Sequence, residues 1–391
     1  MAELIAVVNA GSSSVKFGFY NCEGDEPLLL KGQVEQIGVS PSLEASDGEG
    51  NELARKTWPA DGFRHPQAMV AILETARELL PGSTVKGVGH RVVHGGTRFA
   101  APVEVTAEII AELEKLTPLA PLHQPHNLAP IKGIAEKMPH IHQVACFDTA
   151  FHQSQPHLAQ AFALPREISD SGVRRYGFHG LSYDYVSGRL RDVAPDHANK
   201  RIIIAHLGNG ASLCALNGGK SVATTMGFTA VEGLMMGTRC GSIDPGVLIY
   251  LMDEHGMDVR GLEKLVYKQC GLLGVSGISS DMRTLRQSDD PRAREAIDLF
   301  IYRIVREIGS LSAALGGIDG LVFTGGIGMR DAKTRAEVAA GCAWLGAELD
   351  EERNAGGDGL ISTDSSRLPM WVVSTDEERV IARQTAAILG L

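Results

Sequence analysis

Two segments of the chain share the pattern of a strand, a glycine-containing polar turn and a second strand. The first is VVNAGSSSVKFGFY, which begins at Val7, and the second is RIIIAHLGNGASLCAL, which begins at Arg201. When the two segments are aligned, Asn9 corresponds to His206. Self-similarity of this kind indicates an internal duplication, although strand–turn–strand units are common enough that coincidence stays an alternative. A chain of 391 residues is long enough for the two domains that a duplication would give.

Strand-like and helix-like segments alternate along the rest of the chain. Apolar and β-branched runs predict strands at 4–8, 15–20, 28–34 and 143–147, and again within 201–216, 320–328 and 370–378. Apolar residues at helical spacing follow Pro66 and Thr106, and each of these two residues suits the start of a helix. This alternation is typical of an α/β protein. The segment 39–61 is polar and rich in turn formers, and it predicts a surface insertion.

The composition limits the ligands that the chain can bind. Its 45 glycines are more than the usual share of about 7%, and many lie in short runs where the backbone can approach a ligand. A tight turn of small residues exposes N–H groups that can bind an anion, and Lys16 follows the first such turn. The net charge of −10 argues against nucleic-acid binding, which needs a basic face. Any polyanionic ligand must therefore be held locally.

Cysteine usage and the N-terminal residues suggest a cytoplasmic location. The six cysteines lie far apart and include no C-x-x-C pair, which fits free thiols in a reducing compartment. The opening MAELIAVVNAG lacks the basic start of a signal peptide, so we expect no such leader. No run approaches the length of about 18 apolar residues that a membrane span requires, so we expect no membrane partner.

Three common site patterns fail in this sequence. A Walker A loop would need glycine where Cys214 stands, ahead of the GKS at 219–221. The Rossmann pattern that begins at Gly326 fails because Asp331 occupies the place of the third glycine. Two histidine pairs have metal-like spacing, but no third ligand lies nearby in sequence, so hydrogen-bonding histidines are the favoured interpretation. These pairs are His90 with His94 and His123 with His126.

Eight motifs, taken together, resemble the acetate kinase family. In chain order they are NAGSSSVKF, GHRVVHGG, FDTAFH, RYGFHGLSY, HLGNGAS, MGFTAVEGLMMGTRCGSIDPG, SSDMR and FTGGIG. They follow that family's order and cover essentially the whole chain. The resemblance implies an α/β fold of two duplicated RNase-H-like domains, the actin-like ATPase fold, with an interdomain active-site cleft. We therefore expect one domain at 1–150 and a second at 151–391, whose last helix packs back on the first.

The resemblance also implies an activity. Members of the family transfer the γ-phosphoryl group of ATP to acetate, giving acetyl phosphate and ADP, and run readily in reverse. The expected metal ion is Mg²⁺ or Mn²⁺, and the expected assembly is a homodimer with small-molecule substrates. Phosphoryl transfer depends on positioning and on neutralising charge. Because acetate is already ionised at pH 7, the reaction requires no strong base.

Matching positions carry the family's catalytic and metal-binding roles onto this sequence. Arg239 and His179 would stabilise charge on the moving phosphoryl group, and Asp148 would orient the carboxylate or the metal ion. A magnesium ion needs only one or two protein oxygens besides the phosphates, and Asn9 and Glu377 stand at the family's positions for these ligands. Taken alone, Asp148 could instead cap a helix, and Glu377 could favour a helix N-terminus.

Substrate-binding residues follow from the same motifs. Arg91 would bind the carboxylate, since a planar guanidinium fits two oxygens better than an ammonium group does. The wall of the acyl pocket would include Val93, Leu122, Phe178 and Ala230. The ATP phosphates would be held by Ser12, Lys16, His206, Leu207, Gly208, Asn209 and Gly210. The nucleoside would be bound by Asp281, Met282, Arg283, Gly326, Ile327, Gly328, Met329 and Arg330.

Two departures from the family pattern affect specificity. Met329 and Arg330 follow Gly328 where the family usually carries Glu-Asn, which puts part of the adenosine contact in question. Ala230 stands where many members have proline, which would make the acyl pocket roomier. One methylene is worth only about 1–3 kcal/mol in such a pocket, so propionate kinase activity remains an alternative. A chaperone- or actin-like ATPase is the alternative of a different class, and it would need no acyl pocket.

Overall fold

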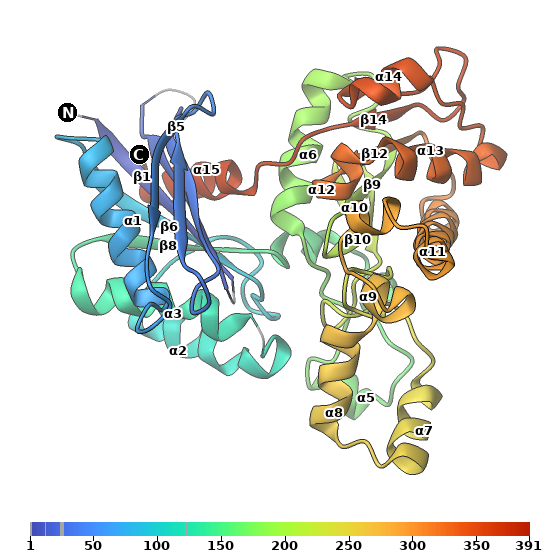
Figure 1. The fold of residues 1–391 in the computed structure, drawn as a ribbon, viewed down its shortest axis with the longest axis horizontal. Coiled ribbons are helices and arrows are strands. Elements are labelled where there is room, and N and C mark those ends of the chain that lie inside the picture. The colour runs from blue at the N-terminus through green and yellow to red at the C-terminus, as the bar shows by residue number, and fades with distance from the viewer. Residues whose placement is uncertain (1, 12, 24–26, 122) are drawn as a thin grey trace. The chain divides into compact units, whose positions relative to one another are not determined.

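The computed structural model describes residues 2–11, 13–23, 27–121 and 123–391. Ser12 and Leu122, predicted to contact phosphate and the acyl group, lie outside the described residues. The chain divides into two compact units, each with its own sheet (Figure 1). Unit 1 comprises Met1–Ala150 and Asp376–Leu391, and unit 2 comprises Phe151–Thr375. No helix in the described ranges is long and apolar enough to cross a bilayer.

Unit 1 is built on an eight-stranded sheet with the order β5-β4-β3-β2-β1-β6-β8-β7. Strand β1 is antiparallel to β2 and parallel to β6, and β6 is parallel to β8. The strands are β1 (Glu3–Ala10), β2 (Val15–Asn21), β3 (Leu28–Glu35), β4 (Ser42–Ser46), β5 (Glu52–Thr57), β6 (Thr84–Val92), β7 (Val103–Glu104) and β8 (His142–Phe147). The helices are α1 (His65–Leu79), α2 (Ala107–Lys115), α3 (Gln124–Lys137) and α15 (Glu377–Leu389), with a short turn of helix at Thr117–Leu119.

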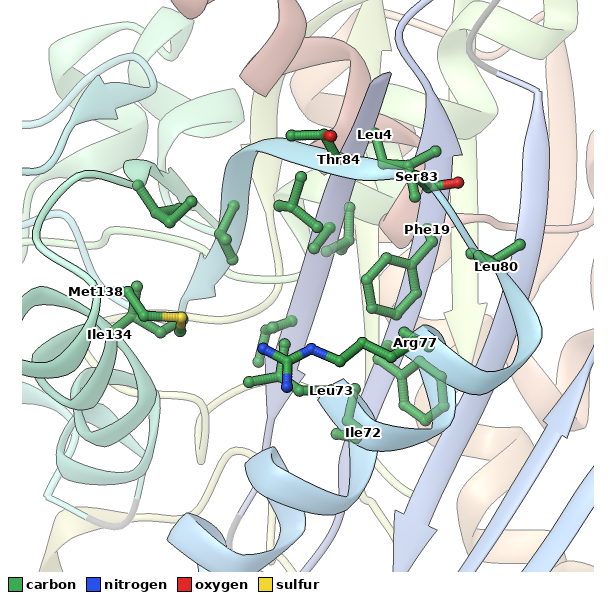
Figure 2. Close-up of a pocket in the computed structure, with 18 of the residues that line it drawn as sticks. Leu4, Phe19, Ile72, Leu73, Arg77, Leu80, Ser83, Thr84, Ile134 and Met138 are labelled. Atoms are coloured by element: carbon green, nitrogen blue, oxygen red, sulfur yellow. The ribbon is translucent and has the colours of Figure 1, made fainter. Parts of the chain in front are cut away.

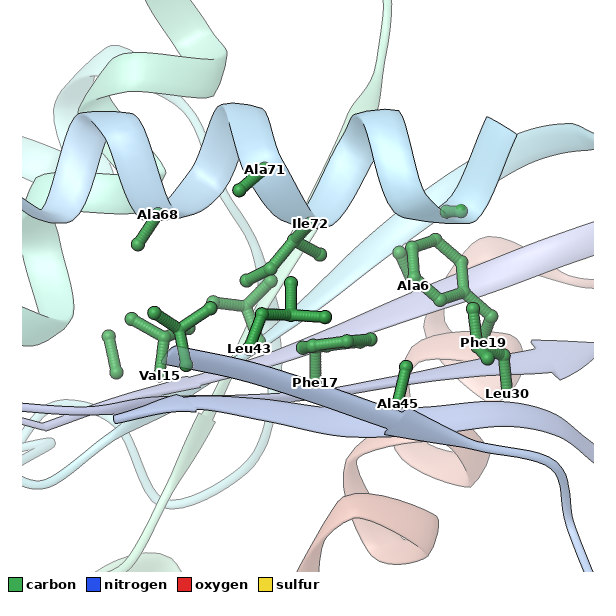
Figure 3. Packing of buried hydrophobic residues seen from close by; sticks show 14 of the residues in the cluster. Ala6, Val15, Phe17, Phe19, Leu30, Leu43, Ala45, Ala68, Ala71 and Ile72 are labelled. Atoms are coloured by element: carbon green, nitrogen blue, oxygen red, sulfur yellow. The ribbon is translucent and has the colours of Figure 1, made fainter. Parts of the chain in front are cut away.

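The face of the unit 1 sheet that carries α1 is packed by alternate strand residues. Figure 3 shows Val15 and Phe17 of β2 directed toward Ala68, Ala71 and Ile72 of α1. A strand presents every second residue to one face, and a helix presents residues three and four apart. The apolar face of the strand packs on the apolar face of the helix. This confirms the strand predicted at 15–20 and the helix predicted after Pro66. The helix predicted after Thr106 is also present, and the Thr106 hydroxyl accepts a hydrogen bond from the backbone N–H of Ile109.

Helix α15, from the far end of the chain, packs against β1, β6 and β8 in unit 1 (Figure 1). Two glycines of β6 make this close approach possible. A Cβ atom at Gly89 would lie 2.3 Å from Oγ1 of Thr385, and one at Gly87 would lie 2.3 Å from Cδ1 of Leu389. Val88 between them faces the core on the other side of the sheet. The spacing of the two glycines therefore positions the start of α15 beside the ends of β1 and β6.

The segment 39–61, which the sequence predicted as a surface insertion, contains two regular strands that were not predicted. It contains β4 and β5, which extend the sheet through antiparallel pairing with β3 and with each other. Leu43 and Ala45 alternate with polar residues and are 0% and 2% exposed. The turn formers gather in one tight turn, where the carboxylate of Asp47 accepts hydrogen bonds from the backbone N–H groups of Glu49 and Asn51. The many turn formers in the segment obscured the alternation of apolar and polar residues that is typical of a strand.

Unit 2 repeats the central topology of unit 1. Its six-stranded sheet has the order β11-β10-β9-β12-β14-β13. Strand β9 is antiparallel to β10 and parallel to β12, and β12 is parallel to β14. The series β10, β9, β12 and β14 therefore corresponds in order and direction to β2, β1, β6 and β8. In register, Asn9 pairs with Lys16 across its hairpin and His206 pairs with Ser212. The duplication is thus visible in the pairing of both sheets.

Helices cover the unit 2 sheet. Tyr183, Val186 and Leu190 of α6 pack with Ile202 and Ile204 of β9, while α11 packs against β10 and α9. The strands are β9 (Arg201–Leu207), β10 (Ala211–Asn217), β11 (Lys220–Thr224), β12 (Gly320–Thr324), β13 (Gly359–Leu360) and β14 (Met370–Val372). The helices are α4 (His157–Gln160), α5 (Arg166–Asp170), α6 (Gly180–Val193), α7 (Pro245–His255), α8 (Val259–Lys264), α9 (Gly271–Ser276), α10 (Met282–Arg286), α11 (Pro291–Leu315), α12 (Gly325–Arg330), α13 (Ala332–Gly341) and α14 (Glu351–Gly356). Shorter helical turns lie at Ala150–Ser154, Leu265–Gln269 and Ala343–Leu345.

Unit 1 also contains an apolar cavity with a volume of about 360 Å³. Figure 2 shows Phe19, Ile72, Leu73, Ile134 and Met138 among the side chains that surround it. These side chains come from α1, α3 and the sheet, and they belong to the core or its border. None of the described residues that line it is a predicted site residue. The cavity is therefore separate from the site described next.

Candidate active site

The parallel strands β6 and β8 carry Arg91 and Asp148 to the same edge of the unit 1 sheet. Asp148 follows β8, and its backbone N–H donates to the carbonyl of Val92 at 3.1 Å. Its carboxylate accepts from Arg91, with Nε 3.0 Å from Oδ1 and Nη2 2.6 Å from Oδ2. Asp148 is 1% exposed. The side chain is therefore half of a buried bidentate ion pair, and the helix-cap alternative does not hold.

The first turn of α15 adds two acidic residues beside this pair. Oε2 of Glu377 lies 3.9 Å from Nε of Arg91. Nδ2 of Asn9 donates to Oε1 of Glu378 at 3.1 Å, and Nη1 of Arg91 lies 3.4 Å from Oδ1 of Asn9. We call Asn9, Arg91, Asp148, Glu377 and Glu378 the carboxylate cluster. It gathers three carboxylates and an amide around one guanidinium.

The carboxylate cluster has an excess of negative charge. Burial raises the pKa of Glu377 to about 7, and the neighbouring Asp148 and Glu378 act in the same direction, whereas Arg91 and Lys16 oppose the shift. Burial lowers the pKa of Arg91, but the nearby carboxylates more than offset this effect and keep the guanidinium charged. Carboxylates that are costly to ionise together are a suitable environment for a divalent cation.

The donor set fits a magnesium ion that is only partly held by protein. Within the described ranges, no three His, Cys, Asp or Glu side chains are arranged to hold a metal ion by themselves. Magnesium usually keeps several water molecules and takes one or two protein oxygens together with substrate phosphates. The amide oxygen of Asn9 and the carboxylate of Glu377 belong to the same cluster and match this requirement.

Buried polar residues behind the cluster hold the strand ends in place. Asn127 of α3 accepts from the backbone N–H of Val93 at 2.9 Å and donates to the carbonyl of Ala10 at 2.6 Å. His90 is hydrogen-bonded to Gln143 at 2.8 Å, and burial lowers its pKa to about 4. Nδ1 of His94 accepts from the backbone N–H of Gly96 at 2.9 Å. The histidines at 90 and 94 therefore form hydrogen bonds, as the sequence favoured.

In unit 2, His179 and His206 form a stacked pair. Their ring centroids are 4.3 Å apart and their planes are inclined by 20°. His206 lies near the end of β9, while His179 directly precedes α6 and has φ +58°. Nδ1 of His179 is 2.8 Å from Oγ of Ser212, and Nδ1 of His206 is 2.8 Å from Oγ of Ser182. Ser212 of β10, the strand paired with the strand of His206, thus orients His179. Ser182 of α6, the helix that follows His179, orients His206.

The glycine turn after His206 lies against this pair. A Cβ atom at Gly210 would be 3.3 Å from both Nε2 of His179 and Nη2 of Arg239. Nη1 of Arg239 donates to the carbonyl of Ala230 at 2.7 Å. The structure therefore brings together the two predicted catalytic residues of unit 2 and the predicted phosphate loop. Phe178, next in sequence to His179, is buried.

A cavity with a volume of about 720 Å³ lies beside this loop in unit 2. Eight residues predicted to bind nucleotide line it, namely Gly208, Asn209, Asp281, Met282, Arg283, Gly326, Ile327 and Arg330. Gly328 and Met329 are not among the lining residues, and their carbonyls accept hydrogen bonds from the buried Arg335 at 3.0 and 2.8 Å. The remaining lining residues were not predicted from the sequence. They are Ser280, Arg286, Gln287, Asp331, Ala332 and Lys333.

Some of the residues missed by the sequence analysis left a signal in the sequence. Arg286 lies four residues after Met282, and Lys333 lies three residues after Arg330, both at helical spacing. Glu378 directly follows the predicted metal ligand. Asn127 and Ser212 left no such signal, because their importance comes from partners that are distant in sequence.

Comparison with known proteins shows the family. The Acetokinase family is matched over residues 4–383. An acetate kinase of Rhodopseudomonas palustris is 51% identical over 389 residues, which is 98% of both chains. A propionate kinase structure from Francisella tularensis has a TM-score of 0.92 at 34% identity and covers 99% of this chain and 100% of that one. An acetate kinase structure from Porphyromonas gingivalis has a TM-score of 0.86 at 40% identity, with the same coverage.

These matches confirm the predicted two-sheet α/β fold of the actin-like ATPase type and the predicted ATP:acetate phosphotransferase activity. ATP is accordingly a substrate, and the other substrate is a small molecule. Relatives named acetate kinase support acetate as the acceptor better than the propionate alternative. The chain belongs to the acetokinase family.

Proposed function

We propose that the chain transfers the γ-phosphoryl group of ATP to acetate directly and in line, and that the carboxylate cluster of unit 1 and the residues around His179 in unit 2 each supply groups that this reaction needs. An oxygen of the acetate carboxylate would attack the γ-phosphorus, and the bond to the ADP oxygen would break. The nucleophile and the phosphate chain are both anions, so the barrier depends on cancelling their repulsion. Arg91, Arg239 and Lys16 supply positive charge in a protein whose net charge is −10.

Arg91 binds the acetate carboxylate in this proposal. Its side chain is 26% exposed, and among the described residues Nη1 has only a long contact to Asn9, so the guanidinium can still donate to a ligand. Asp148 occupies Nε and Nη2 and thereby orients the plane of the guanidinium. Asp148 is thus an orienting residue and does not need to remove a proton, since acetate is already ionised.

The small and apolar residues predicted for the acyl wall would contact the methyl group of acetate. Val93 and Phe178 are buried, and the carbonyl of Ala230 accepts a hydrogen bond from Nη1 of Arg239. Leu122, the fourth residue predicted for this wall, lies outside the described residues. The small side chain of Ala230 leaves space for one further carbon, so we expect propionate to react more slowly than acetate but measurably.

Asn9 and Glu377 hold Mg²⁺ in the proposed site, with Mn²⁺ as a substitute. When bound, the ion neutralises charge on the β- and γ-phosphates. The raised pKa of Glu377 supports this placement, because an added cation would relieve the repulsion among the three carboxylates. Asn9 presents its amide oxygen toward Arg91, so binding the ion would replace that long contact.

The groups of unit 2 hold ATP. The turn from His206 through Gly210 lies against Arg239 and His179 and contacts the phosphates, and these two side chains stabilise charge on the transferring group. The 720 Å³ cavity accommodates the nucleoside. Its four basic residues, Arg283, Arg286, Arg330 and Lys333, outnumber its two acidic residues, Asp281 and Asp331, which suits an anionic nucleotide.

A homodimer is supported by helix α7. Its apolar side chains are solvent-exposed: Val247 is 40%, Ile249 60%, Tyr250 55% and Met252 45% exposed. No residue of α7 is buried. Exposed apolar side chains concentrated on one helix mark an interaction surface, and we propose a second copy of the chain as its partner. None of the six cysteines, all of which lie in the described residues, forms a disulfide, which supports action in the reducing cytoplasm.

One observation carries this proposal: the bidentate pair of Arg91 and Asp148 lies beside Glu377, a buried carboxylate whose raised pKa favours binding of a cation. The decisive experiment measures ATP consumption and acyl hydroxamate formation with formate, acetate, propionate and butyrate. Acetate should give the highest kcat/KM, with propionate lower by about 10- to 200-fold, the range for one methylene. A preference for propionate would move the assignment to the propionate alternative. ATP hydrolysis that is independent of any acid would contradict the proposal and favour the ATPase alternative.

Removal of the metal ion gives a second check on the same reaction. Treatment with EDTA should abolish hydroxamate formation, and addition of Mg²⁺ or Mn²⁺ should restore it. The variant Glu377→Gln should need a higher Mg²⁺ concentration for half-maximal activity, because an amide is a weaker ligand than a carboxylate. An unchanged Mg²⁺ requirement would remove Glu377 from the metal site.

A further inference from the structure

Two buried hydroxyl groups connect the core of unit 2 to His179. The phenol oxygen of Tyr183 is 2.5 Å from Oγ of Ser212, and the same Oγ is 2.8 Å from Nδ1 of His179. Tyr183 and Ser212 are both 0% exposed. In the part of the chain that the structure describes, the Tyr183 hydroxyl has no other hydrogen-bond partner, and Ser212 Oγ has only these two. We call these three residues the hydroxyl chain.

The direction of each hydrogen bond follows from this set of partners. Burial raises the pKa of Tyr183 well above its ordinary value, so the phenol keeps its proton. That proton can be donated only to Ser212 Oγ. The proton of Ser212 must then go to its other partner, Nδ1 of His179. Nδ1 is therefore an acceptor, and the neutral imidazole carries its proton on Nε2.

Each arrangement with a proton on Nδ1 leaves a hydroxyl without an acceptor. If Nδ1 donated to Ser212, either the serine proton or the tyrosine proton would point at no acceptor among the described residues. An unsatisfied buried hydroxyl costs free energy equivalent to a preference of about 5- to 150-fold for the satisfied arrangement. Cooperativity between successive hydrogen bonds strengthens the same preference, because donation by Tyr183 polarises the hydroxyl of Ser212.

The other ring nitrogen faces the proposed phosphate loop. A Cβ atom at Gly210 would be 3.3 Å from Nε2 of His179, and it would be equally distant from Nη2 of Arg239. The proton on Nε2 thus lies on the same side as the guanidinium that would stabilise the phosphoryl group. The stacked ring of His206 restricts the tilt of the imidazole.

We propose that Ser212, oriented by Tyr183, is a positioning residue that holds His179 as the tautomer with its proton on Nε2, so that this N–H donates to the transferring phosphoryl group. The inference rests on the proposed function of His179 for its catalytic meaning, but the tautomer itself does not depend on that function. No proton is transferred in the step: His179 donates a hydrogen bond while the acetate–phosphorus bond forms and the bond to ADP breaks.

The test combines a spectroscopic and a kinetic measurement. Histidine labelled with ¹⁵N would be observed through two-bond ¹H–¹⁵N correlations, and the His179 signals would be assigned by their loss in His179→Gln. The wild-type protein should show Nε2–H for His179. Ser212→Ala removes the donor to Nδ1, but it also leaves the Tyr183 hydroxyl unsatisfied. The double variant Ser212→Ala/Tyr183→Phe removes both hydroxyls together, which keeps the loss of stability small.

In the double variant, the signal of the Nδ1–H form should become detectable, and kcat should fall about tenfold, while KM for ATP and for acetate should change less than about threefold. Tyr176→Phe is the matched control. It also removes a phenol hydroxyl in unit 2, one that donates to the carbonyl of Gly172 at 2.7 Å outside the hydroxyl chain. This control should keep both the His179 spectrum and kcat.

Three results would overturn the proposal. They are a wild-type His179 with its proton on Nδ1, an unchanged tautomer in the double variant, or a changed tautomer with unchanged kcat. A failure of the proposed function would look different. The wild-type protein would then lack acetate-dependent turnover, while the NMR comparison of wild-type, double variant and control would still decide the tautomer.

Discussion

Arg91 and Asp148 face each other across two adjacent parallel strand ends, with Nη2 2.6 Å from Oδ2, although they are 57 positions apart in sequence. The carboxylate is almost completely buried, whereas the guanidinium is partly exposed. This asymmetry means that Asp148 orients the guanidinium of Arg91, while the exposed part of the guanidinium is available to a ligand. The geometry explains why an aspartate without access to solvent can still influence a reaction.

Asp148→Asn should therefore disturb acetate binding through Arg91. An amide can accept from only one of the two guanidinium nitrogens, so the planar group loses its fixed orientation. We expect KM for acetate to rise about tenfold or more and kcat to fall about 100-fold, the range for losing one preorganised group. Steady-state kinetics at varied acetate would measure both values. Near-normal turnover would remove Asp148 from the catalytic set.

Arg239→Ala should separate catalysis from nucleotide binding. The arginine lies beside the phosphate loop, and the nucleoside cavity is lined by other residues. By analogy with arginines that stabilise phosphoryl transfer, kcat should fall by about 10³-fold or more. Calorimetry should give a Kd for ATP within about threefold of the wild-type value. If binding and turnover weakened equally, the transition-state role of Arg239 would be contradicted.

Gly210→Ala should slow the reaction without unfolding the protein. The added methyl group would enter the space 3.3 Å from both Nε2 of His179 and Nη2 of Arg239 and would displace at least one of them. We expect kcat to fall by about 10- to 100-fold, since small misplacements at such sites cost about that much. Gly188→Ala in α6 is the control: its Cβ atom would meet nothing within 4 Å. The control should keep kcat and gain about 0.5–1 kcal/mol of helix stability.

Ile249→Glu should weaken the proposed dimer. The substitution places a charge on the exposed apolar face of α7, where a partner copy would have to desolvate it. Analytical ultracentrifugation should show a shift from dimer toward monomer at low micromolar concentration. Leu158→Glu introduces the same change at a side chain that is 88% exposed elsewhere in unit 2, and it should leave the assembly unchanged. An identical sedimentation profile for all three proteins would exclude α7 as the interface.

Asp319→Asn tests how pH affects the stability of unit 2. The pKa of Asp319 is lowered to about 2 from the ordinary aspartate value of 3.8, mainly by the hydrogen bond from the side chain of Arg201. A carboxylate whose pKa is depressed in the folded state stabilises the folded protein above about pH 4, and this stabilisation is lost as the pH falls toward 2. Because the pair is partly exposed, we expect the variant to lose about 1–2 kcal/mol of unfolding free energy at pH 7. Urea unfolding at pH 7, 4 and 3 should show this difference shrinking, and a constant difference would contradict the assignment.

Much of the fold could be read from local patterns. The strand at 15–20 and the helix after Pro66 followed from periods of two and of three to four, because their apolar faces pack on each other. The paired hairpins were visible as two similar glycine turns, and strand order confirms the duplication. The strands within the segment 39–61 were not predicted, since short edge strands carry only two buried residues, Leu43 and Ala45, against many polar ones.

The chemical types of the groups at the site followed from the sequence, because the residue identities and motifs specify an arginine, an amide or a glycine turn. Which of these groups contact one another depends on the tertiary structure. Strand pairing placed Arg91 beside Asp148, and the packing of α15 brought Glu377 and Glu378 to the same edge. The pairing of β9 with β10 and the packing of α6 likewise placed Ser212 beside His179. Such contacts depend on strand register and helix packing, which join residues that are far apart in the chain and leave no local pattern in the sequence.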